Sequence, residues 1–281
     1  MDWSKAKTIL IVAFLITNII LAFFVVHSRR SLEPSLTDDF IGEVVARLDS
    51  KDIKLSTEIP REELGLVPLT VSYEALDPQL INTRLYGGQA QLEEMENRLV
   101  LRDGLSESSI ENGKLFKYEA YQGQANYKDL DREQALDLAG DFIRRLGFDR
   151  DDLVQSYLLK IGDKYLVSYS KKYEGVYVEK AYIDILVGSQ GVERAERLWL
   201  DIRARGDAKI YTSRAPKSLL KLLSRDSVYG KEIVDISICY FFDPGQHEYI
   251  ETVENAKEGK TLPGWRILFS DGSRLILDNY N

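Results

Sequence analysis

An uncharged apolar run from Ile9 to Val26 is the feature that most constrains this chain. It holds 18 residues, and only Thr17 and Asn18 interrupt it. As a helix rising about 1.5 Å per residue, such a run spans roughly 27 Å, close to the ~30 Å hydrocarbon layer of a bilayer. It is also longer than the ~7–15 apolar residues of a secretory signal peptide. The sequence therefore predicts an uncleaved transmembrane anchor at residues 9–28, after a short tail at residues 1–8.

The charges beside this run do not determine its orientation. Lys5 and Lys7 precede it, and Arg29 and Arg30 follow it. Because cytoplasmic ends are recognised by an excess of basic residues, two against two is a tie.

Thr17 and Asn18 are polar side chains near the middle of the predicted anchor. They could hydrogen-bond to a neighbouring helix, for roughly 0.6–2 kcal/mol, or bond back to carbonyls of their own helix. Asn is harder to satisfy within one helix than Thr. We therefore predict these two residues as candidate contacts with a partner's transmembrane helix.

The remainder of the chain is acidic. The net charge is −8, and residues 1–28 contribute +1 from Lys5 and Lys7 against Asp2, so the rest carries −9. Such a surface repels phosphate backbones and anionic headgroups, so nucleic acid is not an expected partner. The single cysteine, Cys239, lies in an apolar run and is predicted to be a buried small apolar side chain.

A first α+β unit is predicted at residues 37–125, after a juxtamembrane linker at residues 29–36. Helical spacing of apolar residues begins after Thr37. Alternating stretches separated by Gly-containing turns then predict short strands at residues 53–59, 69–73, 97–101 and 115–121.

A second unit is predicted at residues 126–281. It opens with a helix that Asp131 caps and Gly147 ends. Pro216 marks a further helix, and Asp271-Gly272 turns a final hairpin. The expected strands are residues 153–161, 164–173, 176–187, 192–202, 233–242, 265–269 and 275–277. The predicted fold class is thus α+β, with a single N-terminal transmembrane helix and two domains of a helix plus an antiparallel meander.

No catalytic constellation stands out in the sequence. His27 and His247 have no second His or Cys nearby, and no phosphate-binding loop, nucleophile elbow or calcium loop occurs. We therefore predict no catalytic, metal-binding or cofactor-binding residue, no cofactor, and a protein that is not an enzyme. A hydrolase built from two scattered carboxylates would escape this search and stays open.

Tyrosines recur at intervals of four, at Tyr165, Tyr169, Tyr173 and Tyr177. They could form an aromatic surface for a partner or a glycan. The favoured interpretation is that they pack within a sheet and keep their hydroxyl groups wet.

The opening Met1-Asp2-Trp3-Ser4-Lys5-Ala6-Lys7-Thr8-Ile9, which runs into an apolar helix with Asn18-Ile19-Ile20-Leu21, resembles the YycI family. The length, the helix-plus-meander units and the terminal Pro263-Gly264-Trp265-Arg266-Ile267 agree with this resemblance. YycI proteins are membrane-anchored accessory proteins of the WalK/WalR (YycG/YycF) two-component system of Gram-positive bacteria.

The resemblance implies a cell-membrane protein with a cytoplasmic N-terminus, two extracytoplasmic domains of YycH-like fold and no catalytic residues. The implied partners are a YycH-like protein and a WalK-type sensor histidine kinase, which the protein would modulate through transmembrane-helix and ectodomain contacts in cell-wall homeostasis. Two alternatives stay open beside it. One is an extracytoplasmic module that binds a cell-wall fragment or peptide, and the other is an inhibitor domain similar to PepSY domains.

Overall fold

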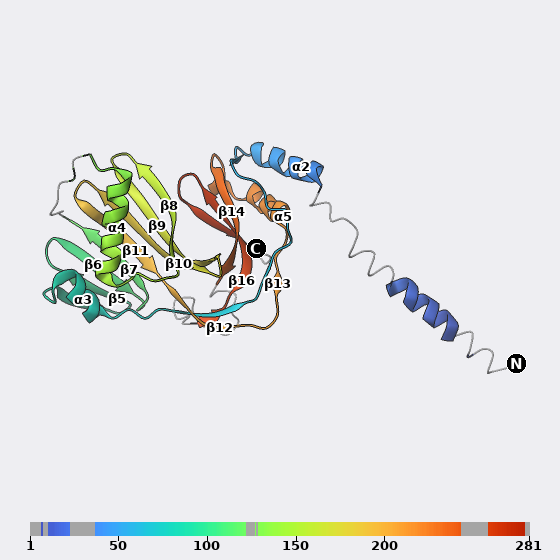
Figure 1. The fold of residues 1–281 in the computed structure, drawn as a ribbon, viewed down its shortest axis with the longest axis horizontal. Helices are drawn as coiled ribbons and strands as arrows, with labels where there is room; N and C mark the ends of the chain where they lie inside the picture. The colour runs from blue at the N-terminus through green and yellow to red at the C-terminus, as the bar shows by residue number, and fades with distance from the viewer. Residues whose placement is uncertain are drawn as a thin grey trace.

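The computed structural model describes residues 7, 11–22, 37–121, 127, 129–242 and 258–278. Residues 11–22 are helical and are drawn in blue in Figure 1. Among the described residues, no helix has the length and apolar character needed to cross a bilayer. The predicted tail, anchor and linker extend over residues that lie outside this description, so they stay predictions.

Strands are the most frequent elements in the rest of the described chain, and twelve of them form one sheet. These are β1 (Lys54–Leu55), β4 (Gln91–Met95), β5 (Arg98–Arg102), β6 (Ser106–Glu111), β7 (Leu115–Ala120), β8 (Leu153–Ile161), β9 (Lys164–Tyr173), β10 (Val176–Gly188), β11 (Gly191–Leu198), β14 (Glu232–Phe241), β16 (Leu262–Phe269) and β17 (Arg274–Leu277). The main order is β17-β16-β14-β10-β11-β7-β6-β5-β4; β9 lies beside β10, β8 beside β9, and β1 beside β14. Two smaller sheets contain β12 (Leu200–Arg205), β3 (Leu69–Tyr73) and β15 (Glu258–Lys260), and β13 (Ile210–Tyr211) with β2 (Gly65–Leu66).

Strand β10 joins the two parts of the large sheet. Residues 177–178 pair in parallel with residues 239–240 of β14, whereas residues 182–188 pair antiparallel with β11. Between these segments the register against β9 shifts, and Lys180 has a φ of 65°. Such a bulge bends a strand, and here it lies where β10 changes its neighbour.

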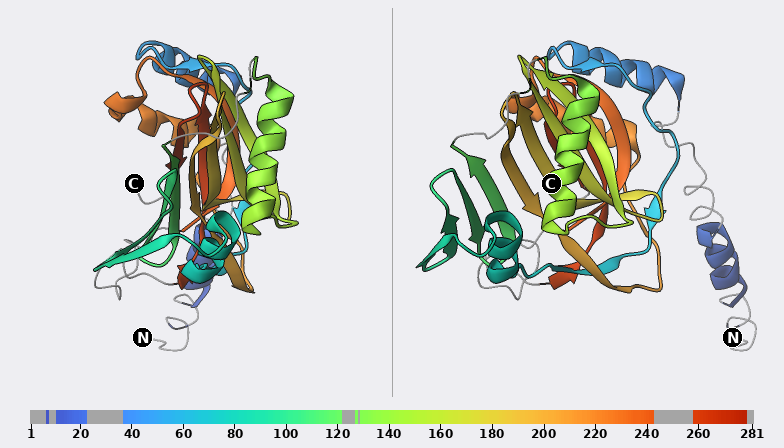
Figure 2. Two further views of the ribbon diagram at one scale, coloured as in Figure 1. Left: turned by 90° about the vertical axis from the view of Figure 1, so that its left-hand side faces the viewer. Right: turned by 60° about the vertical axis from the view of Figure 1, so that its left-hand side comes forward.

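The helices and the buried apolar residues fall into two clusters. In the first, α4 (Arg132–Leu146) packs on β9, β10 and β11, and α3 (Pro78–Tyr86) packs beside α4. In the second, α2 (Asp38–Asp49), α5 (Ala215–Leu219) and the 3₁₀ turns η2 (Leu220–Ser224) and η3 (Asp226–Val228) contribute to a core with β14, β16 and β17. Figure 2 shows α4 on one side of the strands and α5 on the other.

Several predicted elements agree closely with the structure. Strands β3, β8 and β9 have the predicted bounds, and α4 begins after Asp131, whose carboxylate accepts the N–H of Gln134. The helix ends at Gly147 with a φ of 65°. The prediction of a mixed fold with both helices and strands is therefore confirmed, and strands are the more numerous.

Other elements differ from the predictions. Helix α3 and strands β4 and β6 were not predicted, and the single strand expected at residues 192–202 is divided at Trp199 into β11 and β12. Strands from both predicted units share one sheet, because β7 pairs with β11. The predicted boundary between residues 125 and 126 lies outside the described residues and stays a prediction.

The turn between β16 and β17 is held by Asp271. Its carboxylate accepts the N–H of Ser273 at 2.9 Å and lies 2.9 Å from Lys231 Nζ. Gly272 has a φ of 83°, a conformation that glycine adopts without strain.

Asp271→Asn is expected to weaken the fold modestly at neutral pH. Partial burial alone would raise the pKa of Asp271, but hydrogen bonds from Lys231 and Ser273 lower it to about 2. Because the folded-state pKa lies below the unfolded value of 3.8, the carboxylate stabilises the fold above that value and loses this effect as the pH falls toward 2. The side chain is half exposed, so we expect less than about 1 kcal/mol.

Thermal-unfolding midpoints of the two chains between about pH 2 and pH 6 measure this effect. The gap between them should close toward pH 2. A gap that stays constant across the range would contradict the prediction.

Candidate protein-binding surface

Exposed apolar side chains of the folded region gather at one end of the sheet. Seven large apolar side chains beyond residue 22 are exposed in the described part of the chain, and five lie between residues 80 and 121. The five are Leu80, Leu92, Met95, Leu105 and Tyr121, and the other two are Ile161 and Tyr211. Exposed apolar side chains that are concentrated in one region make that region a candidate interaction site. We call the region of α3 and β4–β7 that carries them the α3–β7 surface; it forms the left end of the molecule in Figure 1.

Strand β4 is an edge of the large sheet. Among the described residues it pairs with β5 alone, and all five of its residues are exposed. The outer side of an edge strand presents unpaired backbone N–H and C=O groups. Such an edge can accept a strand from another protein.

A groove of about 730 Å³ opens beside the C-terminal end of β4. Its walls come from the chain after β3, the start of α3, the β4–β5 turn and the β6–β7 turn. Leu76, Met95, Leu99 and Ile110 supply its apolar lining. The volume falls within the ~300–1,000 Å³ of ordinary ligand sites.

The acidic and basic side chains that line the groove differ in how they are paired. Glu94, Glu96 and Glu258 are exposed, and none of them forms an ion pair with another described residue. The basic side chains of the lining, in contrast, already contact other groups. These contacts are Arg98 Nη2 to Glu107 Oε1 at 2.8 Å, Arg203 Nε to Ser72 Oγ at 2.6 Å, and Lys114 Nζ to the centre of the Tyr73 ring at 4.3 Å. The lining thus holds four carboxylates against three basic side chains, and three of the carboxylates have no ion-pair partner among the described residues.

A second cavity, of about 350 Å³, lies at the other end of α3. Its lining includes Tyr86, Tyr118, Phe142 and Arg145. Burial raises the pKa of Tyr86, so its hydroxyl group stays protonated at neutral pH and can donate a hydrogen bond.

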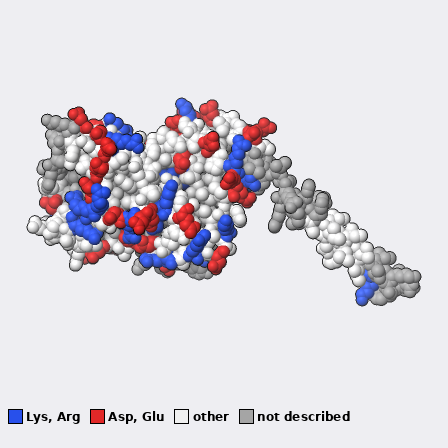
Figure 3. Space-filling view, viewed as in Figure 1, with Lys and Arg blue, Asp and Glu red and all other residues white. Residues whose placement is uncertain are grey.

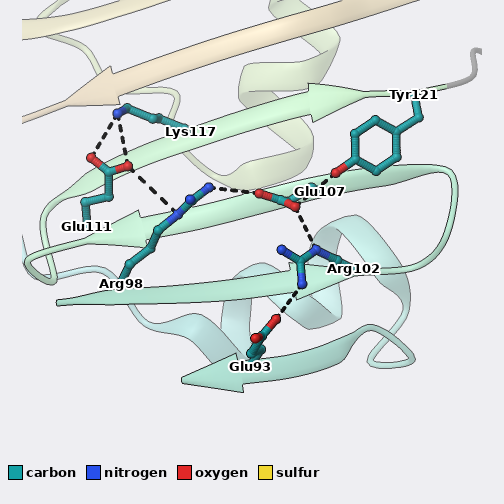
Figure 4. A network of polar contacts seen from close by, with 7 residues as sticks. All are labelled: Glu93, Arg98, Arg102, Glu107, Glu111, Lys117 and Tyr121. Atoms are coloured by element: carbon teal, nitrogen blue, oxygen red, sulfur yellow. Dashed lines mark hydrogen bonds and ion pairs between the residues drawn. The ribbon is translucent and has the colours of Figure 1, made fainter. Parts of the chain in front are cut away.

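Hairpins β4–β7 carry a ladder of paired charges, shown in Figure 4. Its ion pairs are Glu93 with Arg102, Arg102 and Arg98 with Glu107, and Arg98 and Lys117 with Glu111. Partial burial would raise the pKa of Glu107, but hydrogen bonds from Arg102 and Tyr121 lower it overall. Opposite charges on neighbouring strands contribute roughly 0.2–1 kcal/mol per pair, so the ladder stabilises the register that presents β4 as an edge.

The predicted contact residues Thr17 and Asn18 lie on the helical residues 11–22 and are exposed. Thr17 Oγ1 donates to the carbonyl of Ala13 at 2.9 Å, and Asn18 Nδ2 donates to the carbonyl of Phe14 at 3.1 Å. Both therefore have an acceptor within their own helix. Their contact with a partner helix stays a prediction.

The four tyrosines at intervals of four do not line the groove or the cavity. Tyr165 is 7% exposed, Tyr173 packs on Tyr240 with ring centres 6.2 Å apart, and Tyr177 lies against Arg266. This geometry favours the packing interpretation.

Cys239 is buried, as predicted, and its Sγ lies 3.4 Å from the carbonyl oxygen of Gly264. Burial raises the pKa of this thiol well above its usual value, so it is not a thiolate at neutral pH. The described residues contain no group of three or more His, Cys, Asp or Glu that could hold a metal ion. His27 and His247 lie outside the described residues.

The predicted site residues did not include the groove residues. The lining of the groove comes from segments between Ser72 and Glu258. Segments so far apart in the sequence share no local spacing that could predict a site. The one local signal was the Leu92–Met95 stretch, which places two acidic residues between two apolar ones.

No protein-family model matches the sequence, and neither does any curated protein. Several solved structures resemble the fold. An uncharacterized protein from Eubacterium rectale is 11% identical, with a TM-score of 0.50 over 83% of this chain and 90% of that one. YycH from Bacillus subtilis is 13% identical, with a TM-score of 0.49 over 76% of this chain and 53% of that one. The C-terminal domain of Bacillus megaterium YpeB is 10% identical, with a TM-score of 0.39 over 73% of this chain and 95% of that domain.

This chain thus spans about half of YycH, at 53% of its length. At 11% identity, the Eubacterium rectale structure shows a shared fold and nothing about activity. The resemblance to YycI stays a prediction from the sequence.

Proposed function

We propose that this protein is a non-enzymatic, membrane-anchored regulator that binds partner proteins through the α3–β7 surface. The observation that carries this proposal is the presence of exposed apolar side chains, an edge strand and a groove in one region. The start motif, which resembles that of YycI, supplies the partners: a YycH-like protein and a WalK-type sensor kinase. Regulation of the kinase of a cell-wall-homeostasis system is the role that follows.

The chemistry of the surface favours binding over catalysis. The groove lining contains no histidine or cysteine among the described residues. Figure 3 shows acidic and basic side chains interspersed over the viewed face, an arrangement typical of a solvated protein surface rather than of a nucleic-acid site.

A regulator of this kind acts by binding two signalling states of the kinase with different affinities. Coupling free energies of ~1–3 kcal/mol are usual for such effects. Apolar contacts and a few hydrogen bonds, divided between the ectodomain and the anchor, are enough to supply them.

Leu92→Lys combined with Leu105→Lys is expected to weaken association with the partner at least tenfold, or about 1.4 kcal/mol. Both side chains are exposed, so charge at these positions disrupts docking and leaves the core intact. Ile161→Lys is the control, because the exposure of Ile161 lies between those of Leu92 and Leu105 but the residue lies on β8. Co-purification of the full-length chain with the kinase and the YycH-like protein measures the effect. Equal recovery of partners by all three chains would refute the proposed surface.

Thr17→Leu with Asn18→Leu tests the contribution of the anchor. If these side chains hydrogen-bond to a partner helix, their loss should reduce co-purification several-fold, in line with ~0.6–2 kcal/mol. Ile16→Leu is a control within the same helix. Unchanged association and unchanged regulon output would remove the helix contact from the proposal and leave the α3–β7 surface standing.

A further inference from the structure

Strand β4 leads into the groove, whose lining includes its last two residues, Glu94 and Met95. We infer that β4 and the groove bind an extended, basic segment of a partner protein, which pairs with β4 as an added strand. This inference rests on the proposed function, since it names the kind of segment that the α3–β7 surface accepts.

The backbone of β4 is suited to such an addition. Each residue from Gln91 to Met95 pairs with a residue of β5, and no other described strand pairs with β4, so its outer edge can accept an added strand. The ion pair between Glu93 and Arg102 ties β4 to β5 (Figure 4). A preformed edge reduces the ordering cost of binding, because the incoming segment alone must become ordered.

The charges of the groove select the partner. Glu94, Glu96 and Glu258 are acidic groups with no ionic partner among the described residues, whereas the basic groups of the lining are already engaged. A lysine or arginine on the incoming strand would supply the missing positive charge. A second copy of this chain fits poorly, because pairing two β4 strands would bring like charges together, which destabilises strand pairs.

The apolar residues of the groove indicate that the bound segment also carries apolar side chains. Side chains alternate between the two faces of a strand, so Glu94 and Met95 point to opposite sides of β4. Met95 is exposed, and methionine adapts to apolar groups of varied shape. A segment that fits thus places a basic side chain opposite Glu94 and an apolar side chain opposite Met95.

The probe is a fluorescent peptide of four Lys-Val repeats, and the measurement is its fluorescence anisotropy with the full-length chain. We expect saturable binding that Glu94→Lys with Glu96→Lys weakens at least tenfold. Glu62→Lys is the matched control, because Glu62 is exposed, has no ionic partner among the described residues and lies outside the groove. A peptide of four Glu-Val repeats should not bind. N-methylation of alternate backbone amides in the Lys-Val peptide should weaken its binding, since an added strand needs those donors.

Equal binding of the Glu-Val peptide, or unchanged binding after N-methylation, would overturn the inference. So would a dimer of this chain, seen by sedimentation, that Glu94→Lys abolishes, because it would make the occupant a second copy. Partner co-purification separates the two proposals. If Leu92→Lys with Leu105→Lys abolishes it and the glutamate substitutions do not, the protein-binding function stands and the basic segment is wrong. If neither pair of substitutions affects it, the proposed function itself fails.

Discussion

Arg266→Ala is expected to lower the free energy of unfolding by about 3–5 kcal/mol, the usual effect of removing one partner from a buried ion pair. Arg266 is 1% exposed at the centre of β16. Its Nε lies 2.9 Å from Glu179 Oε1, and its Nη1 lies 3.1 Å from Asp235 Oδ2. Without the guanidinium, the carboxylate of Glu179 would remain buried without its ion-pair partner.

The position of this pair explains why its loss should affect the whole fold. Glu179 lies in the bulge where β10 leaves β14 and joins β11, and Arg266 belongs to the strand next to β14. The guanidinium also packs 4.4 Å from the centre of the Tyr177 ring. The pair thus connects the cluster under α4 with the cluster that contains α2 and α5.

Equilibrium urea unfolding followed by circular dichroism measures the change, with Glu43→Ala as the control. Glu43 pairs with Arg47 on the surface of α2, where an exposed pair one helical turn apart contributes only about 0.3–0.5 kcal/mol. Replacing both buried partners, by Arg266→Met with Glu179→Leu, should recover much of the loss, because no buried charge is then left unpaired and Asp235, which also loses its partner, is 42% exposed. A loss below about 1 kcal/mol for Arg266→Ala would show that solvent reaches Glu179.

Sequence patterns predicted elements whose burial alternates or whose ends are capped. Strand β10 shows this over residues 181–187, where Ala181, Ile183, Ile185 and Val187 are buried and the residues between them are partly exposed. Helix α4 has both an N-cap at Asp131 and a C-cap at Gly147 in addition to its buried stripe. Such elements carry their own signals, so tertiary contacts need not be known.

Helix α3 was missed although its caps are present. Asp77 accepts the N–H groups of Gln79 and Leu80, Pro78 occupies the first turn, and Gly87 ends the helix with a φ of 61°. Only Ile81 and Tyr86 are buried, however, so the helical stripe is too weak to detect. Such a short helix is not stable alone, and its packing beside α4 supplies the missing stability. That contact is tertiary and leaves no pattern in the local sequence.

Strand β4 was missed for a related reason. All its residues are exposed, so no alternation of burial marks it, and its pairing with β5 decides its structure. The same exposure is what makes β4 available to a partner. The exposure that makes β4 a candidate binding edge is thus also the reason that its sequence shows no strand pattern.

Glu74→Ala is the second substitution with a large expected effect, about 3–5 kcal/mol of unfolding free energy. Glu74 follows β3, lines the groove and forms ion pairs with both Arg197 and Arg150. Arg197 is 1% exposed, with its guanidinium carbon 4.1 Å from the centre of the Phe148 ring. Burial lowers the pKa of Arg197 and Glu74 opposes that effect, so removing Glu74 leaves the buried cation without its main counter-charge.

Urea unfolding again provides the measurement, and Glu174→Ala provides the control, because the pair of Glu174 with Arg205 is about half exposed on both sides. Arg150→Ala separates the two contacts of Glu74. Arg150 is 36% exposed, so its loss should cost far less than the loss of Glu74. If Arg197→Met restores most of the stability of the Glu74→Ala chain, the cost lies in the unpaired guanidinium. If it does not, the loss of stability comes from the packing of the groove wall. Glu74→Ala should then also weaken binding of the Lys-Val peptide.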